Sequence, residues 1–155
     1  MLIKDLNSLF DHSYNWTTHI VEIDGIPFLE KCKSNLRTII ESNEYENLLI
    51  VKWAYATKEA CLLPDLNQID LLYFIENELI SLLENDWQSI LYYACMGDGK
   101  KEWRFYSKDI TETLNRIKKS LGEHSFYGDF SFKTEKDPEW NDYYNINQIL
   151  SDCLK

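Results

Sequence analysis

"LLIVKWAYA", residues 48–56, decides the fold that this sequence predicts. In an extended chain these side chains are apolar on nearly both faces, and Lys52 is the single charged residue among them. One face would carry Leu49, Val51, Trp53 and Tyr55, and the other would carry Leu48, Ile50 and Ala54. Strands of this kind are typical of sheets that are covered on both sides. We therefore predict a central, buried strand over residues 48–56.

A helix is predicted after this strand, starting near Pro64. Asp65 can act as its N-cap, with Gln68 as the capping-box partner. Apolar residues then recur at helical spacing, at Leu72, Ile75, Leu79 and Leu82. Acidic and polar residues fall between them. We expect one buried stripe and one exposed acidic face.

Two strands, a second helix and a last strand are predicted next. Residues 89–96 and 102–106 flank the turn Gly97-Asp98-Gly99 and form a predicted hairpin. A capping-box pattern at Asp109 and Glu112 starts the second helix, and alternating aromatic residues from Phe126 to Phe132 predict the last strand. The order strand, helix, strand, strand, helix, strand is that of a ferredoxin-like βαββαβ core, which we place at about residues 46–134.

Two flanking elements complete the predicted α+β domain, which spans residues 1–155 as a single unit. The turn pair Asp24-Gly25 predicts an N-terminal β-hairpin over about residues 15–33, which extends the sheet or covers its free face. A short C-terminal helix is expected from Asn147 to Leu154.

Three sequence blocks occur together in this chain. They are Trp16 followed by Asp24-Gly25-Ile26-Pro27, the hairpin from Gly97-Asp98-Gly99 to Trp103-Arg104-Phe105-Tyr106, and Asp137-Pro138-Glu139-Trp140-Asn141-Asp142-Tyr143. In these blocks the chain resembles, over roughly residues 14 to 145, the bacterial family known as domain of unknown function 695. The resemblance implies a cytoplasmic α+β domain with no catalytic residues assigned to the family.

The third block raises the choice between an active site, a binding surface and a packing element. Proline cannot continue a strand ladder, so Asp137-Pro138 turns the chain out of the sheet. We expect Trp140 to fold back on the end of the sheet with Tyr143 or Tyr144, leaving Glu139 and Asp142 in solvent. This block is therefore interpreted as a packing element.

No pattern in the sequence predicts an enzyme, a metal site or a cofactor. The three histidines have no cysteine or carboxylate at ligand spacing, and the four cysteines contain no CxxC pair. Gly97-Asp98-Gly99 lacks the following helix of a phosphate-binding loop, so we interpret it as a hairpin turn. A Cys-His pair assembled in space stays open as an alternative.

Acidic residues are concentrated in one third of the chain. The formal net charge is −10, and residues 41–86 hold ten acids against two lysines. A chain of this sign repels phosphate backbones, so nucleic acid is not an expected ligand. No apolar run approaches the ~20 residues of a membrane span, and no signal peptide is recognised, so we expect a cytoplasmic protein with no membrane partner.

The function predicted from these features is non-enzymatic binding of a protein partner. The leading hypothesis is an immunity protein whose acidic helix face neutralises a basic, nuclease-type toxin domain. The alternative is a regulatory or adaptor domain unrelated to toxins, and the protein could be a monomer or a homodimer. The predicted partner-binding residues are Glu41, Glu44, Glu46, Asp70, Glu76, Glu78 and Glu84.

Overall fold

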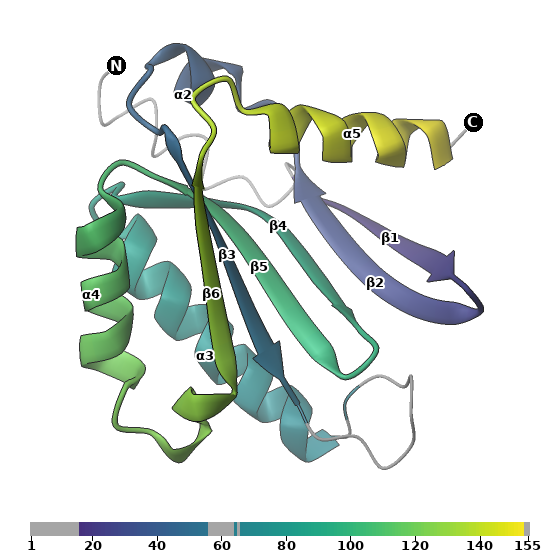
Figure 1. Cartoon of the computed structure of the whole chain (residues 1–155). Coiled ribbons are helices and arrows are strands. Elements are labelled where there is room, and N and C mark those ends of the chain that lie inside the picture. Colours follow the sequence, from purple (N-terminus) through teal and green to yellow (C-terminus); the bar gives the residue numbers. More distant parts are fainter. Residues whose placement is uncertain (1–15, 56–63, 65, 154–155) are drawn as a thin grey trace.

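The computed structural model describes residues 16–55, 64 and 66–153 of the chain. These residues form a six-stranded antiparallel sheet with strand order β1-β2-β4-β5-β3-β6 (Figure 1). The strands are β1 (Trp16–Ile23), β2 (Ile26–Lys33), β3 (Asn47–Ala54), β4 (Ser89–Gly97), β5 (Lys100–Ser107) and β6 (Phe130–Lys136). The α-helices are α2 (Arg37–Glu41), α3 (Leu66–Glu84), α4 (Ile110–Leu121) and α5 (Asn141–Cys153). The fold is therefore α+β.

The predicted central strand is β3, which pairs with β5 on one side and with β6 on the other. Leu49 and Val51 point to one face and Leu48 and Ile50 to the other, and all four are buried. β3 ends at Ala54, and the predicted last residue of this strand, Ala56, lies outside the described residues.

Each face of the sheet has its own hydrophobic core. We call the face under α3 and α4 the aliphatic face, because its core is dominated by leucine, isoleucine and valine side chains. The opposite face lies under α2 and α5 (Figure 1), and we call it the aromatic face, because tyrosines and Trp140 dominate it. A sheet covered on both sides explains why the sequence of β3 is apolar throughout.

Both predicted hairpin turns are present. Asp24 and Gly25 join β1 to β2 with φ values of 52° and 81°, and Asp98 and Gly99 join β4 to β5 with φ values of 52° and 76°. Two consecutive residues with positive φ form the type I′ turn that matches the twist of a hairpin. The N-terminal hairpin extends the sheet beyond β4, through pairs from Leu29↔Met96 to Cys32↔Tyr93.

β4 contains a bulge that the sequence analysis did not predict. The register with β5 shifts between Leu91 and Tyr93, so that Tyr92 is the additional residue. As a result the consecutive residues Tyr92 and Tyr93 both belong to the aromatic face.

Two predicted element boundaries were wrong. Residues Ser125–Asp129 form a 3₁₀ helix, and the last strand begins at Phe130 instead of Phe126. The 3₁₀ turn lets Phe126 and Phe130 both contact Trp53, with ring centroids 6.3 and 6.4 Å away. The C-terminal helix begins at Asn141 instead of Asn147, because the Asp137 carboxylate accepts the backbone N–H groups of Asn141 and Asp142, at 2.9 and 3.0 Å.

Candidate functional site

Helix α3 has a buried side and a solvent-facing side. Leu72, Ile75, Leu79 and Leu83 are buried against the sheet. The predicted stripe was wrong at its last position, since Leu83 is fully buried and Leu82 only partly. We define the outer face of α3 as the residues that lie opposite this stripe, namely Asp70, Tyr73, Phe74, Asn77, Glu78 and Ser81.

Two aromatic side chains stand out on the outer face of α3. Tyr73 is 62% exposed and Phe74 is 42% exposed. Phe74 makes edge contacts with the rings of His124 and Phe126, at 5.8 and 6.4 Å, which fixes it at the junction with the 3₁₀ helix. Exposed aromatic side chains held in place by neighbours are typical anchors of protein interfaces.

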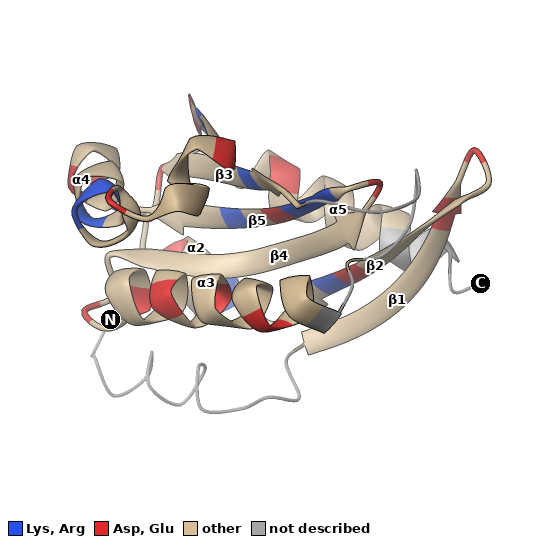
Figure 2. Ribbon diagram, turned by 90° about the horizontal axis from the view of Figure 1, so that it is seen from below, with Lys and Arg blue, Asp and Glu red and all other residues tan. Residues whose placement is uncertain are grey.

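The charge on α3 has one sign. The helix carries Asp70, Glu76, Glu78 and Glu84 and contains no lysine or arginine, as the red segments in Figure 2 show. Asp70 is exposed and Glu78 is half-buried, and they flank the two aromatic side chains along the helix. The Glu78 carboxylate accepts a long hydrogen bond of 3.4 Å from the Ser120 hydroxyl of α4. The outer face of α3 therefore combines an aromatic centre with an acidic margin.

Glu76 does not lie on the exposed face that the sequence analysis predicted. Its side chain is only 14% exposed, and its carboxylate is 3.3 Å from the Lys31 ammonium and 3.7 Å from that of Lys101. The Trp103 indole N–H also donates to it, at 3.0 Å. Burial alone would raise the pKa of Glu76, but Lys101, Lys31 and Trp103 together outweigh burial and hold this pKa below its ordinary value.

Glu84 also faces inward, and its predicted exposure was wrong. Its side chain is 11% exposed, lies 3.8 Å from the Lys33 ammonium and accepts the backbone N–H of Leu91 at 2.8 Å. Pairing between β2 and β4 ends at Cys32↔Tyr93, so β2 offers no carbonyl to the N–H of Leu91 in β4. The Glu84 carboxylate accepts this N–H instead. Burial raises the pKa of Glu84 above its ordinary value despite the nearby Lys33.

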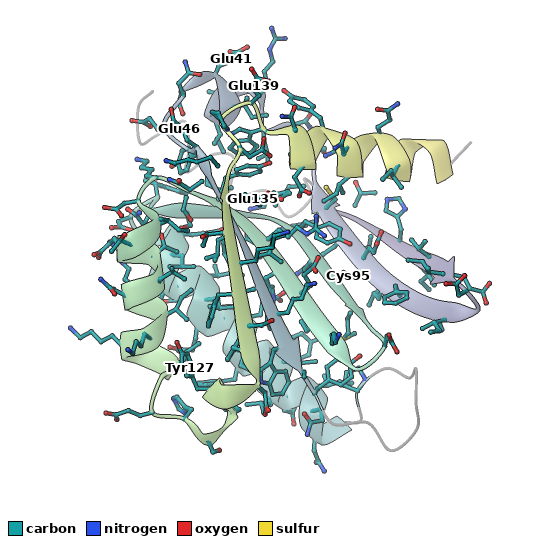
Figure 3. All side chains as sticks on the ribbon, in the orientation of Figure 1. Glu41, Glu46, Cys95, Tyr127, Glu135 and Glu139 are labelled. Carbon is teal, nitrogen blue, oxygen red and sulfur yellow. The ribbon has the colours of Figure 1, made fainter. Side chains whose placement is uncertain are left out.

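The other three predicted acids lie at one end of the sheet, around α2 and the start of β3. Glu41, Glu44 and Glu46 are exposed, and Figure 3 shows Glu41 and Glu46 near Glu139 at this end. Glu41 pairs with Arg37 at 2.8 Å within α2, and Glu44 lies 3.8 Å from Lys108. We call these three residues the sheet-end acids. The seven predicted residues thus fall into three places: the outer face of α3, the sheet end and the buried side of α3.

The third sequence block forms the junction between α5 and the sheet. The indole of Trp140 stacks on the Tyr106 ring, with centroids 3.8 Å apart and planes inclined by 15°, and donates to the backbone carbonyl of Tyr45 at 2.9 Å. The Tyr106 hydroxyl donates to the buried Asp137 carboxylate at 2.7 Å. Trp140 has a φ of 59°, a left-handed conformation that is rare for a bulky residue and is held here by these contacts.

Asp142 lies against the sheet, so its predicted solvent exposure was wrong. The Arg104 guanidinium donates to both of its carboxylate oxygens, at 2.8 and 3.0 Å, and the Tyr92 hydroxyl donates to it as well. The residues of the second and third sequence blocks therefore contact each other directly. Their roles are to cap α5 and to dock it on the aromatic face.

Cys32 and Cys95 are poorly suited to nucleophilic chemistry. Burial raises the pKa of Cys32 to about 12 and that of Cys95 to about 11. Both thiols therefore stay protonated near neutral pH, and only a thiolate attacks or binds metal efficiently. Within residues 16–55, 64 and 66–153, no group of three or more His, Cys, Asp or Glu side chains could hold a metal ion.

Comparison with known proteins places the chain in a family. No curated protein and no solved structure matched it. Within the described part of the chain, no helix has the length and apolar character needed to cross a membrane. The model of a family of unknown function, DUF695, matches residues 14–146, which confirms the predicted resemblance. The chain therefore belongs to the DUF695 family.

Proposed function

We propose that this protein is a non-enzymatic binding domain that holds a basic protein partner on the outer face of α3. One observation carries the proposal: Tyr73 and Phe74 are exposed between Asp70 and Glu78 on a helix that has no basic residue. A few anchor residues, in which aromatic side chains such as tyrosine are enriched, supply most of the binding energy of protein interfaces, and charges at the margin steer the encounter and select the partner.

A nuclease-type toxin domain is the partner class that fits this surface best. Such domains present basic clefts for nucleic acid, and an acidic surface can occupy the place of the phosphates. In a chain of net charge −10, the long-range field would speed association with a basic protein. In this proposal the protein is a cytoplasmic immunity protein, and a regulatory or adaptor domain is the alternative.

The sheet-end acids lie around α2 and the start of β3, away from the outer face of α3, and in this proposal they add to the field that attracts a basic partner. Glu41 lies close to Arg37, and Glu44 lies close to Lys108. These cations reduce the negative field of the two carboxylates. Exposed ion pairs of this kind are weak. A partner could therefore break them and bind the carboxylates. Glu76 and Glu84, by contrast, are engaged with lysines of β2 and β5 and take no part in the proposed contact.

We also infer that residues 47–136 form a ferredoxin-like core. The order β3-α3-β4-β5-α4-β6, the sheet order β4-β5-β3-β6 and the location of α3 and α4 on one face support this assignment. RNA-binding domains with this element order stack bases on the open sheet face. Here α2 and α5 cover that face, which supports a protein partner over nucleic acid.

The experiment pairs the purified protein with the toxin domain encoded by the neighbouring gene of the source bacterium. Calorimetry measures the affinity, and growth of cells producing the toxin measures protection. We expect the combined substitutions Asp70→Lys, Tyr73→Ala, Phe74→Ala and Glu78→Lys to abolish both. The matched control is Glu22→Lys with Glu135→Lys, which reverses two exposed charges on β1 and β6.

Full protection by the outer-face variant would overturn the proposed interface. The wild-type protein could instead bind a housekeeping protein through the same residues and bind no toxin. That result would support the alternative of a regulatory or adaptor domain. Binding that does not weaken with added salt would contradict the electrostatic part of the proposal.

A further inference from the structure

A cleft lies between α3 and the N-terminal hairpin on the aliphatic face. The hairpin extends the sheet past the region that α3 covers, as Figure 2 shows from below. The cleft has a volume of about 270 Å³. Its apolar lining consists of Leu29, Ile69, Leu72, Ala94 and Met96, and Tyr73 lies at its border.

The charged residues that line the cleft are Glu30, Lys31, Glu76 and Lys101, and the two lysines face only one of the two carboxylates. Lys31 and Lys101 both approach the single carboxylate of Glu76, at 3.3 and 3.7 Å. Glu30 also lines the cleft, but its carboxylate accepts the hydroxyl of Tyr93, at 2.9 Å, and Tyr93 belongs to the aromatic face. Two ammonium groups therefore share one carboxylate, in a protein whose net charge is −10.

The two lysines differ in their access to solvent. The side chain of Lys101 is 14% exposed, and that of Lys31 is 30% exposed. Burial lowers the pKa of Lys101, and the charge of Lys31 lowers it further against the opposing effect of Glu76. Two partly buried ammonium groups beside one carboxylate repel each other. A second negative group beside them would offset this repulsion and the cost of their burial, because opposite charges attract strongly where water is partly excluded.

We propose that this cleft binds a small organic anion that has one carboxylate and an apolar body. The carboxylate pairs with Lys31 and Lys101, and the apolar body lies along Leu29, Leu72 and Met96. Ligand pockets usually have volumes of about 300 to 1,000 Å³, and this cleft of about 270 Å³ lies just below that range, so it suits a small ligand. A mostly apolar lining with a few convergent charges is the common composition of such sites.

The test titrates the full chain with octanoate and follows binding by calorimetry and by tryptophan fluorescence. Trp103 reports on the site because its indole N–H donates to Glu76. We expect saturable binding of octanoate. Octanol and octylamine should bind more weakly by about tenfold or more, a difference that corresponds to ~1.4 kcal/mol. Equal affinity for octanoate and octanol would overturn the proposal, as would the absence of saturable octanoate binding.

Variants separate the charge from the shape of the cleft. Lys101→Met and Lys31→Met should each weaken octanoate binding by about tenfold, the fold-change expected for one lost charge pair. The control is Lys52→Met, because Lys52 is an exposed cation of β3 that pairs with Glu102 and does not line the cleft. Unchanged binding in both cleft variants, or an equal loss in the control, would contradict the proposed role of the cleft lysines.

A third variant keeps all charges and fills the cleft. Met96→Trp places a larger apolar side chain among the lining residues and should abolish octanoate binding. Thermal unfolding shows whether each variant is folded before its titration is interpreted. If folded Met96→Trp bound octanoate as the wild type does, the ligand would lie elsewhere and the assignment of the cleft would fail.

Discussion

The buried core under α3 and α4 is mainly aliphatic and contains Trp53, Tyr55, Trp103 and Phe105 as well, whereas half of the buried residues under α2 and α5 are tyrosines and Trp140, several of which make hydrogen bonds. Aliphatic packing is non-directional and tolerates exchanges of similar volume. The aromatic face depends on particular partners, such as the Trp140 indole N–H on the Tyr45 carbonyl. Among the described residues, no buried side-chain nitrogen or oxygen lacks a hydrogen-bond partner. The aromatic face should therefore be the less tolerant of substitution.

The largest expected effect is that of Trp140→Ala. Truncating a fully buried tryptophan should lower the free energy of unfolding by about 3 to 5 kcal/mol. Urea unfolding followed by circular dichroism measures the loss. The control is Tyr144→Ala on the exposed side of α5, expected within about 0.5 kcal/mol of the wild type. A folded Trp140→Ala variant of full stability would return this block to consideration as a binding site.

Conservative exchanges sharpen the comparison of the two faces. Leu79→Met on the aliphatic face should cost less than about 1.5 kcal/mol, because the volume is kept. Trp140→Phe also removes the donor to the Tyr45 carbonyl, and a buried acceptor left without its donor adds about 1 to 3 kcal/mol to the cost of the lost volume. Equal costs for the two exchanges in urea unfolding would contradict the difference between the faces.

Asp137 and Tyr106 allow the hydrogen bonds of the aromatic face to be separated. Asp137→Ala removes the acceptor for the Tyr106 hydroxyl and for two N–H groups at the start of α5, so we expect a loss of about 2 kcal/mol or more. Tyr106→Phe removes one hydroxyl and leaves the helix cap in place, so its expected loss is about 0.5 to 1.5 kcal/mol. Urea unfolding of both variants measures the difference. The reverse order would show that Asp137 does not cap α5.

Glu76 and Glu84 should give opposite pH dependences of stability. The pKa of Glu76 lies below its ordinary 4.5, so its stabilising contribution is present above pH 4.5 and is lost as the pH falls through the folded-state pKa. The pKa of Glu84 lies above 4.5, so its contribution is complete below pH 4.5 and is lost as the pH rises through the folded-state pKa. As the pH rises towards 4.5, the wild type should therefore gain stability relative to Glu76→Gln. As the pH rises above 4.5, it should lose stability relative to Glu84→Gln.

Urea midpoints measured over this pH range for the wild type and both glutamine variants test the opposite slopes. Slopes of the same sign would contradict the environments described for the two carboxylates. Glu41→Gln is a suitable control, because Glu41 lies on the surface and its pair with Arg37 is exposed.

The sequence predicted those parts of the fold that depend on local pattern. The strand β3, the helices α3 and α4 and the two hairpin turns follow from periodicity, caps and Asp-Gly pairs. The start of α5 was missed because its cap is not a local pattern: the Asp137 carboxylate accepts the N–H groups of Asn141 and Asp142 across a turn that includes Trp140 at a positive φ. The register between strands could not be predicted from local sequence patterns. The bulge at Tyr92 and the end of β2–β4 pairing both depend on residues from two different segments of the chain.

The candidate site was predictable only in part, for the same physical reason. Helical spacing correctly placed Asp70 on the solvent side of α3. Glu76 and Glu84 face inward because lysines of β2 and β5 approach them, which depends on how the hairpin joins the sheet. Tyr73 and Phe74 were missed, although helical spacing sets them opposite the buried stripe beside Asp70.

The smallest expected effect on stability belongs to the outer face of α3, where Asp70→Lys should change the free energy of unfolding by less than about 0.5 kcal/mol. The same surface carries the proposed function. The most direct test measures association of the proposed partner, a toxin domain, with two variants: the outer-face variant defined above, and Glu41→Lys combined with Glu44→Lys and Glu46→Lys. We predict that the outer-face variant no longer binds and that the sheet-end variant binds more slowly at low salt. Unimpaired binding by the outer-face variant would contradict the account.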